Sequence, residues 1–163
     1  MSARGLIELS SSPWSSLIVL AKTKDGEWRF CVDYRRLNAI TTKDIYPLPR
    51  IESTLARLHG ADLFTIMDLE RGYWQIPLKE SDREKTAFTT ADGLYQFLVM
   101  PFGVCSKPGT FQRMMDLILT GLRWSECLVY LDDINIYARD PEEHLSRLRN
   151  VLMALRRANL KLK

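Results

Sequence analysis

The chain has 163 residues, of which 46% are hydrophobic and 26% charged, and this composition excludes a disordered protein. Its length predicts a single domain that buries a core of its own. The net charge is only +3, from 23 basic and 20 acidic residues, so bulk charge does not indicate a nucleic-acid-binding protein. Any phosphate-binding surface must therefore depend on where the basic side chains lie.

The three cysteines, Cys31, Cys105 and Cys127, lie far apart in the sequence and lack the spacing of metal ligands. Because the chain has only two histidines, we predict no zinc site and interpret the cysteines as reduced thiols of an intracellular protein. The longest apolar run near the start, residues 17–21, is far shorter than the about 20 residues that cross a bilayer. We therefore expect no membrane partner.

The first predicted element is a β-hairpin over residues 15–33, because two apolar runs flank a turn at residues 24–27. The preceding segment, residues 1–16, is rich in serine and gives little structural signal. The hairpin carries three basic residues, Lys22, Lys24 and Arg29. They predict a basic ribbon that projects beside a functional site. On spacing alone, an edge ribbon kept charged for solubility is slightly favoured.

A second hairpin is predicted over residues 86–99, with its turn at residues 91–93. Two helices are predicted around it. The first covers residues 51–58 and ends at Gly60 as a C-cap. The second begins near Ser106, and its apolar stripe is predicted to be core: Phe111, Met114, Met115, Ile118 and Leu122.

The last predicted helix begins at Asp140, with Pro141 in the first turn and acids where the helix dipole favours them. Four leucines at three- and four-residue steps are expected to pack on a sheet: Leu145, Leu148, Leu152 and Leu155. The second half of this helix and the residues after it are basic. This basic tail is compatible with two roles, contact with phosphate or a solvated face that complements the helix C-terminus.

Acidic residues stand at the ends of two strand-like runs. Along residues 63–68 the side chains alternate, so Phe64, Ile66 and Asp68 share one face. Residues 127–137 predict a hairpin whose tight turn carries Asp132 and Asp133, with Asp132 on the same face as Leu128 and Tyr130. If the two strands are neighbours, the three carboxylates converge.

Three carboxylates in one pocket would form a hard oxygen site that suits Mg²⁺. Two such ions roughly 3.5–4 Å apart can activate an attacking hydroxyl and stabilise a leaving oxygen in phosphoryl transfer. A solvated Asp-Asp turn is the alternative for the pair alone. The elements together predict an α+β fold, with an antiparallel sheet that carries the acids, helices on its other face and a basic β-ribbon beside it.

With these residues in place, the chain resembles the reverse transcriptases, and within them the gypsy-type LTR retrotransposon branch. The resemblance runs from about Gly5 to the last residue. Four ordered segments carry it: Trp28-Arg29-Phe30-Cys31-Val32-Asp33-Tyr34-Arg35-Arg36-Leu37-Asn38, Met67-Asp68-Leu69 with Gly72-Tyr73-Trp74-Gln75-Ile76, Met100-Pro101-Phe102-Gly103, and Tyr130-Leu131-Asp132-Asp133. It implies the fingers and palm of a right-hand polymerase. The fingers-like part is expected at about residues 1–60 and 80–105, and the palm-like part at about residues 61–79 and 106–163.

The resemblance also implies the reaction and its metal site. The expected activity is RNA-directed and DNA-directed DNA synthesis with two Mg²⁺ ions, for which Mn²⁺ is a substitute. Asp68 and Asp132 are expected to bridge the metals, Asp133 to ligate less directly, and the backbone carbonyl of Leu69 to help hold one ion.

Contacts to the substrates follow from the same resemblance. Five residues are expected at the deoxynucleoside triphosphate: Lys22, Lys24 and Arg29 at its phosphates, Tyr73 under the sugar as a filter against a 2′-hydroxyl, and Phe102 beside the nucleotide. Tyr130 and Lys107 are expected at the nucleic acid. Without the family, Tyr73 would be interpreted as a half-buried aromatic residue and Lys107 equally as a solvated lysine.

The expected partners are an RNA or DNA template-primer, the triphosphate and the rest of a Pol polyprotein, meaning thumb, RNase H and integrase. Thumb and RNase H are not recognised in the chain. The expected location is intracellular and cytoplasmic, including virus-like particles. Two other functions stay open: an inactive relic that serves only as a nucleic-acid-binding or interaction module, and a metal-dependent phosphohydrolase. The latter is disfavoured because no histidine or lysine stands near the acids to act as a base.

Overall fold

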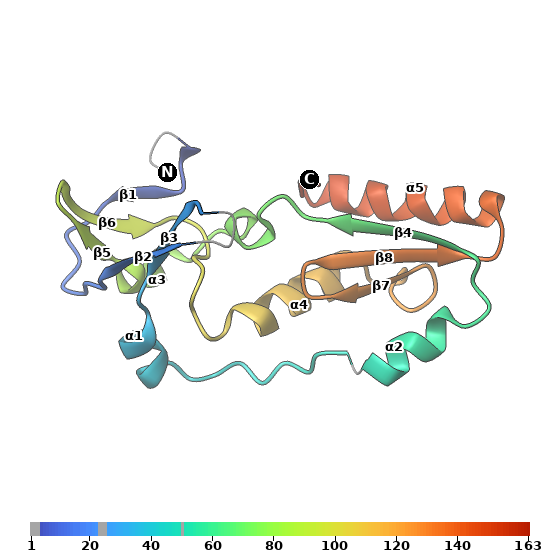
Figure 1. Ribbon diagram of the computed structural model, residues 1–163, viewed down its shortest axis with the longest axis horizontal. Coiled ribbons are helices and arrows are strands. Elements are labelled where there is room, and N and C mark those ends of the chain that lie inside the picture. The colour runs from blue at the N-terminus through green and yellow to red at the C-terminus, as the bar shows by residue number, and fades with distance from the viewer. Residues whose placement is uncertain (1–3, 23–25, 50) are drawn as a thin grey trace. The chain divides into compact units, whose positions relative to one another are not determined.

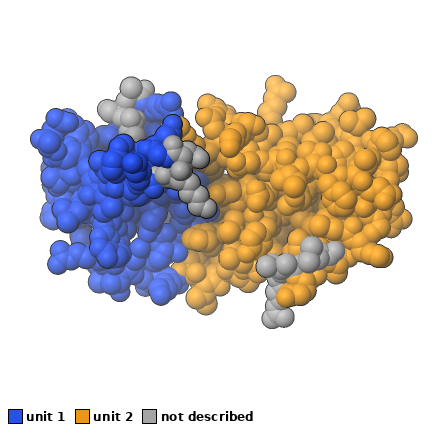
Figure 2. Space-filling view, in the orientation of Figure 1, with its two compact units in different colours: residues 1–43, 73–107 blue, residues 44–72, 108–163 orange. Residues whose placement is uncertain are grey.

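The computed structural model describes residues 4–22, 26–49 and 51–163. The predicted phosphate contact Lys24 lies outside the described residues. The chain forms two compact units (Figure 2), which we call unit 1 (residues 1–43 and 73–107) and unit 2 (residues 44–72 and 108–163). These units are defined by contacts within the fold, so the predicted division into fingers-like and palm-like segments stays a prediction.

Unit 1 contains a three-stranded antiparallel sheet and a two-stranded ribbon (Figure 1). The sheet has the order β1 (Ile7–Leu9), β6 (Gly93–Phe97) and β5 (Phe88–Thr90), and the ribbon pairs β2 (Ile18–Lys22) with β3 (Trp28–Val32). Both predicted hairpins are confirmed. Strand β1 was not predicted, because three residues in a serine-rich segment are too few to show an alternating pattern.

The core of unit 1 is built on aromatic residues of β3, β5 and β6. Phe88 is almost fully buried and contacts Phe30 edge-on, with ring centroids 5.5 Å apart. Tyr34 is also buried, and its hydroxyl donates to the carbonyl of Thr86 at 2.8 Å. Burial raises the pKa of Tyr34, which keeps the hydroxyl protonated as a donor. Short helical segments complete the unit or stand at its boundary: α1 (Arg35–Ile40), the 3₁₀ helix η2 (Gly72–Gln75), α3 (Glu80–Arg83) and the 3₁₀ helix η3 (Glu84–Thr86).

Unit 2 contains the strands that carry the acids. They form an antiparallel sheet of order β4 (Leu63–Asp68), β8 (Asp133–Ala138) and β7 (Cys127–Tyr130), so β8 is the central strand. One face is covered: Ile134 and Ile136 are fully buried. The other face of β4 is open, because Phe64 is 52% and Ile66 70% exposed. The predicted alternation along residues 63–68, with Phe64, Ile66 and Asp68 on one face, is therefore confirmed, and that face is the open one.

The helices of unit 2 are α2 (Ile51–Leu58), α4 (Lys107–Ile118) and α5 (Pro141–Arg157). Helix α5 runs along β4 and β8 (Figure 1), and a hydrogen bond of 2.7 Å joins Thr65 Oγ1 to His144 Nε2. The predicted start of α5 is confirmed, since the Asp140 side chain accepts from the Glu143 N–H at 2.8 Å.

The predicted leucine stripe of α5 is wrong in part. Leu145 is 65% and Leu152 39% exposed, whereas Val151 and Leu155 are buried. The buried face therefore passes through Val151 rather than Leu152. The four-leucine pattern missed this shift because it ignored a valine one position away, at an equally good helical spacing from Leu148 and Leu155.

The three cysteines are free thiols, and Cys127 is fully buried in β7. Burial raises the pKa of the Cys127 thiol to about 12, so it stays protonated at neutral pH. Among the described helices, none combines the length and the apolar character needed to span a bilayer.

Candidate active site

The acids of unit 2 lie in a row across the sheet. In the strand register Asp68 of β4 is directly opposite Asp133 of β8, and Asp133 is directly opposite Tyr130 of β7. Directly opposite residues have Cα atoms about 4.5–5.5 Å apart and side chains on the same face. Asp68, Asp133 and Tyr130 therefore share the open face at one end of the sheet.

The turn between β7 and β8 differs from the predicted one by one residue. Tyr130 and Asp133 close the hairpin, so Leu131 and Asp132 form its two-residue turn and Asp133 already belongs to β8. The sequence predicts instead a turn that carries both acids, with Asp132 on the same face as Asp68. Because side chains alternate with a period of two, this shift makes Asp133 the direct cross-strand neighbour of Asp68.

The turn holds a strained residue. Leu131 has φ +54°, a left-handed conformation that Gly adopts freely and Leu rarely does. A side chain in helix α4 supports it, since Gln112 Oε1 accepts the Leu131 N–H at 3.2 Å. Gln112 is fully buried, and its Nε2 donates to Asp116 Oδ1 at 2.9 Å and to the Val129 carbonyl at 3.4 Å. Gln112 thus connects α4, β7 and the turn that carries Asp132.

The surroundings of Asp68 are polar and open. Its side chain is 48% exposed, and its Oδ2 lies 3.8 Å from Lys163 Nζ. The expectation that no lysine stands near the acids is therefore wrong. Backbone pairing holds the last residues beside it: the Lys163 N–H donates to the Asp68 carbonyl, and the Glu70 N–H to the Lys161 carbonyl, both at 3.0 Å. Leu69, whose carbonyl was predicted to help hold a metal, is buried and forms a β-bridge with Leu162.

The acids supply part of a metal site. Within the described residues, no three His, Cys, Asp or Glu side chains are grouped so that they could hold a metal ion. Asp132 lies in the turn and is half-buried, and the predicted metal site of three carboxylates stays a prediction. Asp68 and Asp133 still fit Mg²⁺, which characteristically takes one or two carboxylates and completes its shell with waters and substrate phosphates.

In unit 1, three of the predicted contact residues lie together. Lys107 Nζ is 3.7 Å from the centroid of the Tyr73 ring and 4.4 Å from that of Phe102. The two rings contact edge-on, with centroids 5.8 Å apart. Tyr73 is only 6% exposed, whereas Phe102 is 47% exposed. The arrangement places one cation over two aromatic faces, a favourable cation–π geometry.

The remaining predicted contacts of unit 1 lie on the β2–β3 ribbon. Lys22 and Arg29 are both exposed there, and Lys22 Nζ is 5.9 Å from the centroid of the Trp28 ring. Just after β3, a bidentate ion pair with Arg35 lowers the pKa of Asp33 to about 2. The ribbon therefore presents Lys22 and Arg29, and Asp33, the acid just after β3, is already paired.

The sequence interpretation missed two supporting side chains. Besides Gln112, Asn38 ties the segment after β3 to the loop that carries Phe102: its Nδ2 donates to the Gly103 carbonyl at 2.7 Å, and its Oδ1 accepts the Cys105 N–H at 2.9 Å. Asn38 was part of the family-like segment, but no local pattern indicated its role. Gln112 directly follows Phe111, the first residue of the predicted apolar stripe. A polar residue beside that stripe was the available signal of a structural link.

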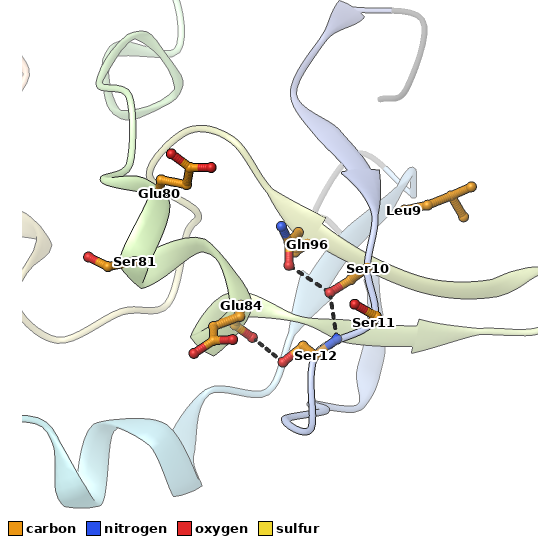
Figure 3. A pocket seen from close by; sticks show the side chains of 8 residues that line it. All are labelled: Leu9, Ser10, Ser11, Ser12, Glu80, Ser81, Glu84 and Gln96. Atoms are coloured by element: carbon orange, nitrogen blue, oxygen red, sulfur yellow. Dashed lines mark hydrogen bonds between the residues drawn. The ribbon is translucent and has the colours of Figure 1, made fainter.

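Unit 1 also has a cavity of about 430 Å³, which contains none of the predicted site residues. Figure 3 shows serines of the N-terminal segment facing Glu80 and Glu84 across it. Hydrogen bonds hold this segment: Ser10 Oγ donates to Gln96 Oε1 at 2.6 Å, and Ser12 Oγ donates to the Glu84 carbonyl at 2.7 Å. These contacts explain how the serine-rich segment becomes part of the fold.

Comparison with known proteins places these features in a family. Residues 20–163 match the family described as "Reverse transcriptase (RNA-dependent DNA polymerase)". The chain is 45% identical over 161 residues to the Pol polyprotein of transposon opus and 44% identical over 164 residues to that of transposon 297, both of Drosophila melanogaster. The two alignments include 96% and 98% of this chain but only 16% of the length of each relative.

Solved structures share the fold. A foamy viral protease-reverse transcriptase in complex with double-stranded DNA superposes with a TM-score of 0.89 over 99% of this chain and 28% of that one, at 24% identity. A prototype foamy virus protease-reverse transcriptase superposes with a TM-score of 0.83 over 98% and 21%, at 26% identity. The predicted α+β fold of a right-hand polymerase is thereby confirmed.

Proposed function

Because the chain belongs to the reverse transcriptase family, we propose that it is the catalytic core of an RNA-directed DNA polymerase from an LTR retrotransposon. In the proposed reaction a primer 3′-hydroxyl attacks the α-phosphate of a deoxynucleoside triphosphate and pyrophosphate leaves. Two Mg²⁺ ions, or Mn²⁺ in their place, would supply the charge stabilisation of this step. The template would be RNA or DNA.

The observation that carries the proposal is the acid row of unit 2. Asp68 and Asp133 present two carboxylates side by side on an open sheet face, with Asp132 in the adjoining turn. Carboxylates that face each other repel unless a cation lies between them. We propose that Asp68, Asp132 and Asp133 hold the metals, with help from the Leu69 carbonyl, and that Tyr130 contacts the primer-template.

Unit 1 would bind the triphosphate. We propose that Arg29, with Lys22 and Lys24, neutralises the phosphates and that Tyr73 excludes a 2′-hydroxyl from the sugar position. Phe102 would lie beside the nucleotide. The ammonium of Lys107, 3.7 Å from the centroid of the Tyr73 ring, supports a role for Lys107 in holding that ring in place or in contacting nucleic acid.

The proposed partners are a template-primer, the triphosphate and further Pol segments that supply thumb, RNase H and integrase. The solved relatives include complexes with double-stranded DNA and with an RNA/DNA hybrid, which supports the first of these. The division into fingers-like and palm-like segments belongs to the same proposal, and so does a cytoplasmic location that includes virus-like particles.

Primer extension in Mg²⁺ by the Asp132→Asn variant tests the proposal. We expect the rate to fall by about 10²–10³-fold, because metal ions contribute several kcal/mol to such transition states, while the melting temperature stays unchanged. The matched control is Asp62→Asn, an exposed acid next to the opposite end of β4, which should leave the rate unaltered. Extension by Asp132→Asn at a near wild-type rate would refute the assignment.

A second function remains, because the chain spans only 16% of the polyproteins it matches. A segment of this kind could bind nucleic acid without extending a primer. The same assay separates the two: binding of a primed template by wild-type protein with no Mg²⁺-dependent incorporation would favour the binding module over the polymerase core.

A further inference from the structure

Unit 2 has a second polar cavity, at the end of its sheet opposite to the acids. The cavity measures about 210 Å³ and lies where the end of α2, the loop between α4 and β7, and the loop between β8 and α5 meet. Its lining includes Ala138, the cross-strand partner of Leu63. Five register steps separate that pair from Asp68 and Asp133, about 17 Å along the strands.

The cavity is rich in uncompensated positive charge. Arg57, Arg139 and Arg147 line it together with His59, and Glu143 is its one carboxylate. Glu143 already has partners: it accepts from the Arg147 guanidinium at 2.6 Å and from the Arg139 N–H at 3.0 Å. Within the part of the chain that the structure describes, neither Arg57 nor Arg139 pairs its guanidinium with a carboxylate.

Aromatic rings lie against two of the cavity's guanidiniums, those of Arg57 and Arg147, and against the neighbouring Arg123. The Arg57 guanidinium carbon lies 5.8 Å and that of Arg123 4.7 Å from the centroid of the Trp124 ring. Arg147 stacks over Tyr137 at 5.3 Å and donates to the Tyr137 carbonyl at 2.5 Å. Arg57 and Arg147 are thus partly ordered before any ligand arrives, which lowers the entropy cost of binding.

The backbone at Trp124 is strained. Its φ of +72° lies in the left-handed region, which is rare for a bulky residue. Two hydrogen bonds of 2.8 Å keep it there: the Trp124 N–H donates to the Cys127 carbonyl, and the Tyr137 hydroxyl donates to the Trp124 carbonyl. Strain that is maintained by surrounding contacts is concentrated at functional sites, and here it presents the indole to the cavity.

These features match one ligand chemistry. Guanidinium groups recognise phosphate through paired N–H donors, and a cavity of about 210 Å³ has room for a phosphate group with its first waters. We propose that this cavity, formed around Arg57, Trp124 and Arg139, is a phosphate-binding site for the backbone of a nucleic-acid strand. The inference that the cavity binds phosphate does not depend on the proposed function. The inference that the phosphate belongs to a nucleic acid rests on that function.

Tryptophan indole N–H resonances provide a direct test that needs no catalysis. The chain has four tryptophans, and Trp124→Phe identifies the relevant signal. We expect a short single-stranded oligonucleotide to shift the Trp124 signal, and sodium phosphate to compete with it. A shift caused by phosphate that the oligonucleotide neither produces nor displaces would overturn the nucleic-acid source. No shift with either probe would overturn the site.

Arginine variants then measure the contribution to binding. The double variant Arg57→Gln/Arg139→Gln should raise the oligonucleotide dissociation constant by about three- to tenfold and make its salt dependence shallower by about 1 in log–log slope, uniformly across sequences. The matched control Lys43→Gln/Lys79→Gln removes the same charge from exposed positions outside the cavity. Equal effects of the two double variants would show non-specific attraction and refute the site. The Asp132→Asn variant should bind the oligonucleotide as tightly as wild type. Loss of primer extension in that variant therefore tests the polymerase proposal, whereas loss of oligonucleotide binding in the arginine variants tests the phosphate site.

Discussion

The two ends of the β4–β8–β7 sheet carry opposite charge and are built differently. At the acid end, Asp68 and Asp133 belong to the strands, so strand register alone brings their side chains together. At the arginine end, Arg57 and Arg139 come from a helix terminus and a loop, and stacking and ion pairing arrange the cavity they line. A strand-based site is positioned by the sheet itself, whereas a loop-based site depends on each supporting contact.

The largest effect on stability is expected at Gln112, the side chain that supports the turn at the acid end. Gln112→Met keeps the approximate shape of the side chain but leaves the Leu131 N–H and the Val129 carbonyl without their contacts to Gln112. Because buried polar groups that lose a partner cost about 1–3 kcal/mol each, we expect the free energy of unfolding to fall by about 2–3 kcal/mol. Denaturant titration measures this change.

The same variant should also raise the Mg²⁺ concentration needed for half-maximal primer extension, because the turn that carries Asp132 loses its anchor. The matched control is Leu117→Met on the same helix, where the side chain is 77% exposed and an effect within about 0.5 kcal/mol is expected. If Gln112→Met is as stable as the control, the hydrogen bonds of Gln112 do not support the turn.

Much of the fold could be predicted because its patterns are local. The alternation along residues 63–68, the two hairpins of unit 1 and the Asp-Pro start of α5 depend on neighbouring residues only. Strand β1 was missed because its three residues gain their conformation by pairing with β6. The stripe of α5 was wrong by one position for a similar reason, since the sheet rather than the leucine spacing selects Val151.

The candidate sites show the same limit. Asp68, Asp132 and Asp133 were recognisable as a group, but the turn was placed one residue too far along, because a hairpin of alternating apolar residues does not reveal its own register. The roles of Gln112 and Asn38 arise from contacts between distant segments. The arginine cavity has no sequence pattern at all, since its residues come from three segments that only the tertiary fold brings together.

A smaller effect is expected at the arginine end. Asp140 caps α5 next to Arg139, and its side chain accepts the Glu143 N–H. Asp140→Ala should lower the free energy of unfolding by about 1 kcal/mol, the usual cost of losing an N-cap. It should also loosen Glu143 and thereby the cavity. Asp140→Asn, which retains a capping oxygen, is the control, and thermal denaturation should show it close to wild type; an equal loss in both variants would contradict the capping argument.

The smallest effect has the opposite sign and concerns the acid end. Directly opposite like charges on neighbouring strands destabilise a sheet. Replacing Asp133 by Asn removes the repulsion with Asp68, so without divalent ions we expect the free energy of unfolding to rise by about 0.2–1 kcal/mol.

Adding Mg²⁺ should reverse the order of the two stabilities, since the metal stabilises wild type by mass action and the variant much less. Melting curves with and without Mg²⁺ measure both effects, and Asp62→Asn should show neither of them. A variant that is less stable than wild type without Mg²⁺ would mean that the Asp133 carboxylate supports the fold through contacts of its own. The sheet would then not store repulsion at its acid end.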